Sequence, residues 1–272
     1  REGSSEHARW LDQVREPALE PERPICDPHH HLWDRAGYRY LEDELLADLG
    51  TGHRVVSTVF VECAWAWRET GPEPLRPVGE TAFVERVAAG HACGGGSRLC
   101  AGIVGFADCL LGEAVGEVLD AHREVSPRFR GIRHAAGWDP SPEVRNSHSD
   151  PPPGLYGDAR FRRGFAELAP RGLTFEAWQY HHQLPEVTDL ARAFPDTTIV
   201  LNHFSGPLGI GPWTGRREEI FRRWREDLAA CDLVLEAIVE DAAAKVELLA
   251  ALGTTARDAT LASNTSSLSI TH

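Results

Sequence analysis

Three successive histidines, His29, His30 and His31, follow a short apolar segment near the start of the chain. Side chains at positions i and i+2 of an extended strand leave the same face, so the imidazoles of His29 and His31 can converge on one point. Neutral imidazole is the commonest side-chain ligand for zinc and similar ions. The spacing therefore indicates a metal or acid–base site; the alternative is a group of histidines whose hydrogen bonds are satisfied locally.

The elements that must position these side chains are indicated by alternating apolar and amphipathic segments. Short apolar runs predict strands over 55–62, 99–106, 129–134, 173–178 and 198–203, after a first strand that carries His29. Helical spacing of apolar positions predicts helices over 80–89, 113–122, 160–168, 184–193 and 216–228. This alternation predicts an α/β protein with a parallel sheet, either a TIM (β/α) barrel or a doubly wound open sheet.

The positions of the polar residues favour the barrel. Like His29 and His31, several polar residues fall at or just past the ends of predicted strands: Glu62, Arg133, His134, His181, His182 and His203. In a barrel these strand ends converge on one mouth, where active sites are built, whereas in an open sheet they are spread along an edge. For the isolated residues His53, His91, His122 and His148 we expect a surface or structural role.

A long polar loop over 137–157 contains three successive prolines. It is either a substrate-covering loop or a disordered insertion. The glycine-rich run over 206–215 lacks the G-x-G-x-x-G spacing of a dinucleotide loop, so it does not predict a phosphate-binding site.

Composition limits the class of protein. The chain has 272 residues, enough for one large α/β domain or two small ones, with a net charge of -13 that argues against a nucleic-acid partner. No apolar run reaches the length of a membrane span, and the polar segment 1–22 does not resemble a signal peptide. The six cysteines form no C-x-x-C pair, which is typical of reduced thiols. We expect a cytoplasmic protein that acts on a small molecule. Because the chain begins at Arg1 and contains no Met, we also expect its natural start to lie elsewhere.

The composition changes near residue 228. All 18 prolines and all eight Trp, four Tyr and ten Phe lie at or before Trp224, and Lys245 is the only lysine. This change indicates a segment of different origin after residue 228. The alternative is a local effect of one alanine-rich helix and one small strand.

Residues 24–228 resemble the amidohydrolase-related family of TIM-barrel hydrolases, also called amidohydrolase family 2. The matching motifs are Asp27-x-His29-x-His31-x-Trp33, Val61-Glu62-Cys63, Phe129-Arg-Gly-Ile-Arg133-His134, Trp178-x-Tyr180-His181-x-Gln183-Leu-Pro185 and Leu201-Asn202-His203-x-x-Gly206-Pro207. The resemblance implies hydrolysis of a lactone, an amide or a related carbonyl substrate.

The resemblance also implies roles for individual residues. His29, His31 and His203 would hold a divalent metal ion, zinc being one possibility, or would polarise the substrate carbonyl without a metal. His181 would complete this shell, although the sequence does not separate it from His182. Glu62 and Arg133 would orient the substrate. In the family an acidic residue on strand eight acts as base or ligand, and the match ends before that strand.

The segment 229–272 is similar to the NAD-binding domain of L-3-hydroxyacyl-CoA dehydrogenase, through 231–245 and through Asn264-Thr-Ser266-Ser267. This similarity implies that Glu240 and Lys245 match cofactor-contacting positions and Ser266 a substrate-contacting position. The glycine-rich loop and the catalytic His-Glu pair of that family are missing, so we expect these positions to be non-functional and NAD not to bind.

These resemblances predict three regions: an N-terminal extension over 1–23, a barrel truncated after strand six over 24–228, and a dehydrogenase-like fragment over 229–272. The last region predicts a strand, a helix and a strand over 233–239, 241–252 and 260–263. We expect these elements to fill the last two strand positions and to put Asn264 where the family keeps its acid, which would impair hydrolysis. The alternatives are an inactive chimeric fusion product and a remnant of an NAD-dependent dehydrogenase.

Overall fold

The computed structural model describes residue 13 and residues 20–91, 96–228, 233–236, 250 and 260–263. Eight parallel strands form one sheet and stand in it in the order in which they occur in the chain. They are β1 (Pro24–His30), β4 (Arg54–Val61), β5 (Arg98–Gly105), β6 (Phe129–Arg133), β7 (Thr174–Ala177), β8 (Ile199–Leu201), β9 (Leu233–Glu236) and β10 (Thr260–Ser263). A doubly wound sheet reverses its strand order at a switch point, whereas a barrel wall does not. The prediction of a barrel-type fold is therefore confirmed, and the doubly wound alternative is wrong.

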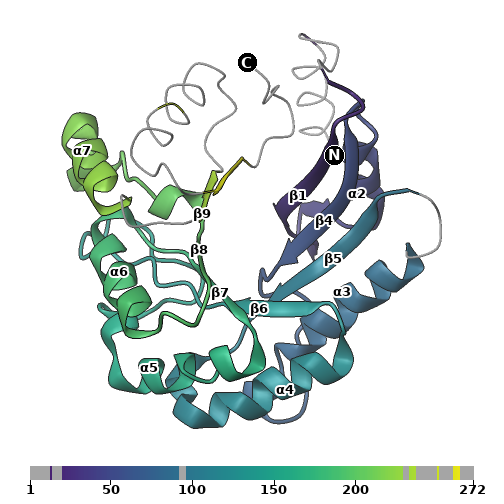
Figure 1. Ribbon diagram of the computed structural model, residues 1–272, viewed down its shortest axis with the longest axis horizontal. Helices are drawn as coiled ribbons and strands as arrows, with labels where there is room; N and C mark the ends of the chain where they lie inside the picture. The colour runs from purple at the N-terminus through teal and green to yellow at the C-terminus, as the bar shows by residue number, and fades with distance from the viewer. Residues whose placement is uncertain are drawn as a thin grey trace.

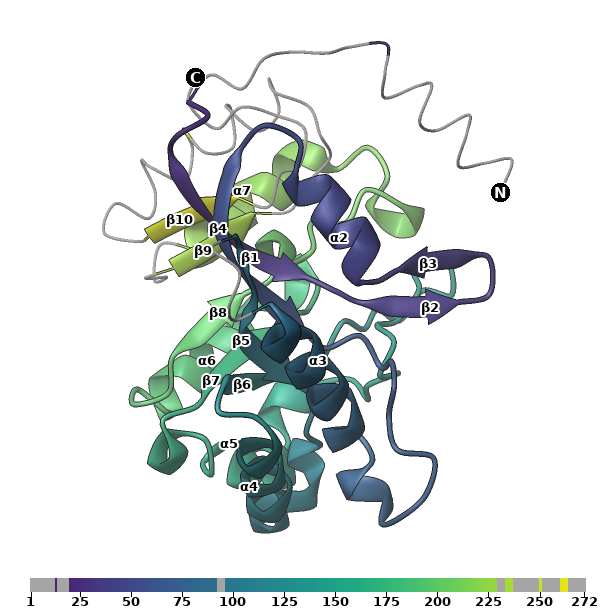
Figure 2. The same ribbon diagram turned by 90° about the vertical axis from the view of Figure 1, so that its right-hand side faces the viewer.

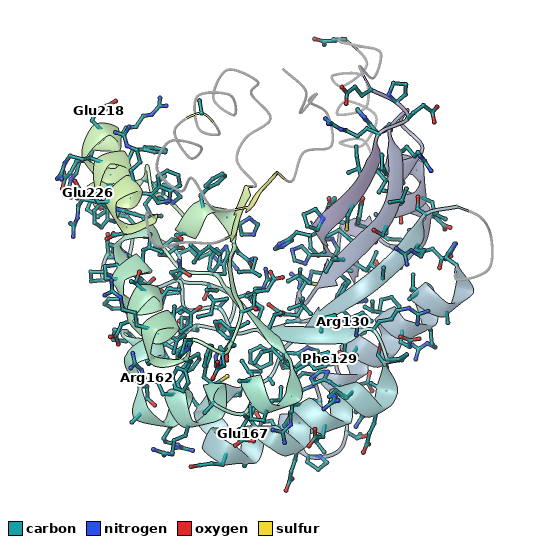
Figure 3. The ribbon with its side chains drawn as sticks, in the orientation of Figure 1. Phe129, Arg130, Arg162, Glu167, Glu218 and Glu226 are labelled. Atoms are coloured by element: carbon teal, nitrogen blue, oxygen red, sulfur yellow. The ribbon has the colours of Figure 1, made fainter. Side chains whose placement is uncertain are left out.

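Helices follow the strands and cover the outer, convex face of the curved sheet (Figure 1). They are α3 (Val78–Gly90), α4 (Val115–Val125), α5 (Ala159–Phe165), α6 (Leu184–Ala193) and α7 (Arg217–Leu228), each within a few residues of a predicted helix. Charged side chains such as Arg162 on α5 and Glu218 and Glu226 on α7 lie on the outer side of this layer (Figure 3). Among the described helices, none has the length and apolar composition needed to cross a bilayer.

Two elements between β1 and β4 were not predicted. An antiparallel hairpin pairs β2 (Trp33–Arg35) with β3 (Tyr38–Tyr40), and helix α2 (Glu42–Leu49) follows it. The hairpin projects from the side of the sheet in Figure 2. Strands of three residues are too short to show an alternating pattern, and α2 buries only Leu45.

The core consists of two apolar clusters on the sheet. The larger cluster packs strands β6 and β7 against the helices and includes Phe161, Phe165, Phe175 and Trp224. The second cluster lies around Phe60 on β4. Burying such side chains contributes about 1.5–3 kcal/mol each, so the clusters fix the strands rigidly. Because the strands are parallel, their carboxyl ends lie along one rim of the sheet.

The sheet is an open arc rather than a closed ring (Figure 1). Its ends are β1 and β10, and within the strands that the structure describes these two do not pair with each other. Strand β9 is joined to β8 through Leu201 and Val234, and β10 pairs with β9 along four residues. The predicted strand over 260–263 coincides with β10, and β9 begins at the predicted residue 233. Apart from residue 250, the predicted helix over 241–252 lies outside the described residues, so the origin of this segment and the boundary at 228 stay predictions.

The loop over 137–157 returns across the rim of the sheet. The backbone N–H of Ser147 donates to the carbonyl of Gly137 (2.7 Å), and the Ser149 hydroxyl donates to the carbonyl of Ala135 (2.8 Å). The Tyr180 hydroxyl donates to the carbonyl of Arg145. These contacts favour a loop that covers the site over a disordered insertion.

Candidate active site

Three imidazoles meet at the carboxyl ends of the two strands β1 and β8. His29 is the penultimate residue of β1, and His31 follows that strand. His203 is the first residue of the short 3-10 helix η6 (His203–Ser205) after β8. The Nε2 atoms of His29 and His31 are 3.3 Å apart, and the ring centroids of His29 and His203 are 4.9 Å apart. The structure therefore brings together the three histidines that the sequence predicted to converge.

Local hydrogen bonds orient the histidines of β1. The backbone N–H of His29 donates to Asp27 Oδ1 (3.1 Å), and Nδ1–H of His31 donates to the carbonyl of Val61 (2.7 Å). His30 faces another direction, with its Nε2 2.9 Å from the Thr58 hydroxyl. The other ring nitrogen of His30, Nδ1, is buried and has no hydrogen-bond partner among the described residues.

His203 is presented by a strained turn. His203, Phe204 and Ser205 have φ angles of 49°, 52° and 57°, in the left-handed region that disfavours residues other than glycine. Such conformations cost about 1–3 kcal/mol each and persist only where the surroundings enforce them. Here the buried indole N–H of Trp224 donates to the carbonyl of Phe204 (2.7 Å). The α7 helix therefore holds the turn that carries His203.

Burial keeps the imidazoles of His29 and His31 neutral. Desolvation, with the nearby Arg133 guanidinium, lowers the pKa of His31 to about 3. Desolvation, followed by Arg133 and the neighbouring imidazoles, also lowers the pKa of His29 well below its usual value. A neutral imidazole offers one N–H to an oxygen and, on its other nitrogen, the lone pair that a metal requires.

A buried ion pair lies directly beside the histidines. Arg133, the last residue of β6, donates from Nε to Glu62 Oε1 (2.6 Å), and its Nη2 donates to the backbone carbonyl of Glu62. Its Nη1 is 3.5 Å from His29 Nε2. Burial opposes the ionisation of Glu62, but Arg133 and then His148 outweigh it and lower the pKa of Glu62 to about 2. Glu62 and Arg133 therefore lie at strand ends, as predicted, and there they form a charged pair that the sequence did not predict.

His148 also belongs to this site, although we expected it to have a surface or structural role. The loop over 137–157 brings its Nε2 within 3.2 Å of Glu62 Oε2, on the side opposite Arg133. No motif in the sequence marks His148, and its partner is 86 residues away in the chain. Only the path of the loop joins them.

A second carboxylic acid, Glu80 on α3, supports the site from behind. Its Oε1 accepts from the backbone N–H groups of Cys63 (3.1 Å) and Trp65 (2.8 Å) in the segment that follows Glu62. Burial, followed by repulsion from Glu62, raises the pKa of Glu80 to about 7. No pattern in the sequence predicted this role, because a glutamate in the first turn of a helix is usually exposed.

His181 lies in a neighbouring cluster rather than beside the three histidines as predicted. Its Nδ1 accepts from the backbone N–H of Leu208 (3.4 Å), and its ring packs edge-on against Trp213 at 4.5 Å. His182 contacts Asp139 Oδ2 through Nε2 (3.0 Å), and the same oxygen accepts from the Trp213 indole (2.8 Å). Burial, then His182, lowers the pKa of His181 to about 4. The reason for the displacement is that His181 and His182 start the 3-10 helix η5 (His181–Gln183), which turns away from the strand.

Aromatic rings join the two clusters. The ring of Trp178 is 6.4 Å from that of His203 and 5.7 Å from that of Tyr180, and the Tyr180 ring is 6.2 Å from that of His182. His134, another residue at a predicted strand end, packs against Phe106 instead, at 5.2 Å.

The spacing of two imidazoles fits a metal ion. Two nitrogen ligands of a tetrahedral zinc ion, at about 2.0–2.1 Å from it, are about 3.3 Å apart, and this is the separation of Nε2 in His29 and His31. Nδ1–H of His31 is engaged with Val61, so its Nε2 carries the lone pair that a metal requires. Among the described residues, however, no group of three or more His, Cys, Asp or Glu side chains is arranged to hold a metal ion.

The residues predicted to be functional in the C-terminal segment cannot be compared with the structure. Glu240 and Lys245, predicted to match cofactor-contacting positions, Ser266, predicted to match a substrate-contacting position, and Asn264 all lie outside the described residues. Their roles stay predictions.

Comparisons with known proteins agree with this architecture. The uncharacterized protein y4mH of Sinorhizobium fredii is 32% identical over 203 residues, which are 66% of this chain and 61% of that protein. The matched part of the chain thus spans about three fifths of the length of this relative.

Solved structures of low sequence identity share the fold. A zinc-bound amidohydrolase from Burkholderia multivorans superposes with a TM-score of 0.62 at 21% identity, covering 89% of this chain and 84% of its own. A putative 2-pyrone-4,6-dicarboxylic acid hydrolase from Pseudomonas putida superposes with a TM-score of 0.58 at 14% identity, covering 92% of this chain and 83% of its own. The Amidohydrolase family model matches residues 26–254, and the chain belongs to that family.

Proposed function

We propose that the protein hydrolyses a lactone or a related cyclic carbonyl compound. The observation that carries the proposal is the convergence of His29, His31 and His203 beside the Arg133 guanidinium at the strand ends. Family membership supports hydrolysis as the reaction class. A lactone is favoured over an amide because one solved neighbour is described as a putative 2-pyrone-4,6-dicarboxylic acid hydrolase.

The site provides donors for a developing oxyanion. When water attacks a carbonyl carbon, negative charge grows on the carbonyl oxygen, and fixed donors that meet it lower the barrier. Arg133 is fixed by the buried Glu62, and the imidazoles beside it are neutral. A substrate carrying a carboxylate or several hydroxyl groups suits this arrangement, because Arg133 and the imidazole N–H groups can bind its oxygens.

A divalent ion is compatible with the same residues. His29, His31 and His203 would hold it, and it would supply Lewis-acid polarisation of the carbonyl. Without it, the lone pair of His31 Nε2 accepts a hydrogen bond, and His29 or a substrate hydroxyl can donate it. The zinc in the Burkholderia neighbour supports the metal-bound form, and the guanidinium of Arg133 at 3.5 Å from His29 favours the metal-free form.

Hydrolysis also needs a group that accepts a proton from water. We propose that no acid is present at the position of the family's strand-eight residue, so the rate is low unless another residue of the site takes that part. The magnitude of such a loss is about 10²- to 10⁴-fold.

A second candidate is a fusion product without activity, which the change of composition after residue 224 favours. A related candidate is a remnant of an NAD-dependent dehydrogenase. Titration with NAD distinguishes them: we expect no binding tighter than roughly 100 μM, about 5.5 kcal/mol.

The test of the proposed hydrolase is an assay of five- and six-membered lactones, including dicarboxylated and sugar lactones, followed by acid release with a pH indicator. Metal content is measured by mass spectrometry on the same preparation. We expect His29→Asn and His203→Asn to lower kcat/KM by about 10²-fold or more, because each removes one group from the carbonyl-binding centre. The matched control is His91→Asn, which changes a histidine paired with the exposed Glu42. Equal activity in all three variants would refute the proposed site.

A further inference from the structure

We infer that His148 is the residue of this site that accepts the proton from the attacking water. The inference rests on the proposed lactone hydrolysis and adds a catalytic residue to it. It starts from the position of His148, which reaches the site from a loop rather than from a strand end.

The hydrogen bond to Glu62 defines the state of the His148 ring. Glu62 is fully buried and is held ionised by Arg133, so its Oε2 can only accept at this contact. His148 must therefore donate from Nε2, and the neutral ring carries its lone pair on Nδ1. A carboxylate behind an imidazole fixes the tautomer and stabilises the imidazolium that forms when the ring takes a proton.

Exposure separates His148 from the buried imidazoles. Its side chain is 37% exposed, whereas His29 and His181 are nearly inaccessible, at 3% and 4%. Burial depresses the basicity of both of these histidines. His148 combines a hydrogen bond to a buried carboxylate with a side chain that is partly exposed to solvent.

The charged and titratable groups around His148 lie at the ends of two strands. Glu62 follows β4, while Arg133 and His134 lie at the end of β6. The Glu62 anion and the Arg133 cation offset each other, so a proton on the imidazole of His148 is not opposed by a net positive charge.

The loop is built to hold this position. Contacts on both sides of His148 tie the loop to the sheet: Ser147 to Gly137, and Ser149 to Ala135. The hydroxyls of Ser147 and Ser149 are also 3.1 Å apart. A fixed backbone on either side places the imidazole at Glu62 without a large entropy cost on binding substrate.

In the proposed reaction, His148 alone carries the proton from the attacking water to the leaving oxygen. The water oxygen bonds to the carbonyl carbon, and the water proton moves to Nδ1 of His148. The ring C–O bond then breaks, its electron pair stays on the ring oxygen, and that oxygen takes the proton from His148. The product is the hydroxy acid, and the imidazole is again neutral.

The first arm of the test measures lactone hydrolysis in the full chain. His148→Asn keeps an N–H donor for Glu62 but has no basic nitrogen, so we expect kcat to fall about 10²- to 10⁴-fold with KM nearly unchanged. His148→Ala leaves room for an added base, and imidazole in the buffer should restore part of its kcat. The control is His91→Asn, a change in another His–Glu pair, whose carboxylate is exposed.

The outcomes separate a catalytic from a structural role. Full activity of His148→Asn, or a loss in His148→Ala that imidazole does not restore, overturns the inference while the proposed hydrolysis stands. A pH profile of kcat that keeps the same acidic limb in His148→Asn overturns it as well.

The second arm does not depend on any substrate. In protein labelled with ¹⁵N-histidine, the ring nitrogens of His148, assigned by their loss in His148→Asn, should show a proton on Nε2 and none on Nδ1 in the neutral form. A proton on Nδ1 overturns the inference. Should wild-type protein hydrolyse none of the lactones, the proposed function fails, and this arm still decides whether His148 is set up as a base.

Discussion

Two pairs of histidine and glutamate in this molecule make the same contact in different surroundings. His148 meets Glu62 inside the site, where the carboxylate is fully buried and also bound by Arg133. His91 meets Glu42 on the surface, where the carboxylate is 42% exposed. An exposed pair contributes about 0–1 kcal/mol, whereas a buried charge that loses its partner is strongly destabilising. The two pairs therefore differ in the burial of the carboxylate and not in the contact itself.

The largest expected difference between the pairs is in stability. Glu62→Gln keeps the shape of the side chain but leaves Arg133 as a buried charge without its counter-ion, so we expect a loss of about 3–5 kcal/mol of unfolding free energy. Glu42→Gln on the surface should cost less than about 1 kcal/mol. Urea unfolding at pH 7 measures both. Equal losses in the two variants would show that burial of the carboxylate does not determine the loss of stability.

A smaller effect concerns Glu80, a buried carboxyl group with no cation beside it among the described ion pairs. Its pKa in the folded protein, about 7, is above the ordinary value of a glutamate, so its contribution is present at low pH and is lost as the pH rises from about 4.5 through about 7. Glu80→Gln cannot ionise and should escape this loss. Its stability relative to wild type should therefore increase between pH 5 and pH 8, by up to about 3 kcal/mol.

Unfolding curves of Glu80→Gln and wild type at the two pH values check this. The neutral amide can still accept from the backbone N–H groups of Cys63 and Trp65, so the fold around Glu62 should be preserved. A difference between the two proteins that does not change with pH would show that Glu80 is ionised in the folded state.

The smallest expected effect is the coupling within the surface pair itself. A double-mutant cycle of His91→Asn and Glu42→Gln should give about 0.2–1 kcal/mol at low salt and less at high salt. A coupling above about 2 kcal/mol would mean that exposure does not decide the strength of these pairs. The same measurement also gives the effect of His91→Asn on stability, which is needed when this variant serves as a control.

The sequence predicted most of the sheet and the convergence of three histidines at its rim, for physical reasons. Strands such as β5 and helices such as α6 are buried along a regular period, so their apolar patterns mark them to within a few residues. His29, His31 and His203 were found because strand ends in a barrel meet at one rim.

The features that were missed depend on distant partners. His148 forms a hydrogen bond with Glu62, and Glu80 accepts hydrogen bonds from the backbone of Cys63 and Trp65. No local sequence pattern indicates these contacts. His181 was placed with the other histidines because it follows a strand, yet a short 3-10 turn redirects it to Trp213. Local sequence does not show where such a turn points.

The order of the strands in the sheet also sets the order in which the site can be made. Each strand pairs with the neighbour that precedes it in the chain, so the wall can grow strand by strand as a ribosome delivers it, with the N-terminal part first. His29 and His31 arrive with β1, Glu62 after β4, and Arg133 with β6, but His203 arrives only after β8. A nascent chain therefore carries most of the strand scaffold before His203 can join His29 and His31.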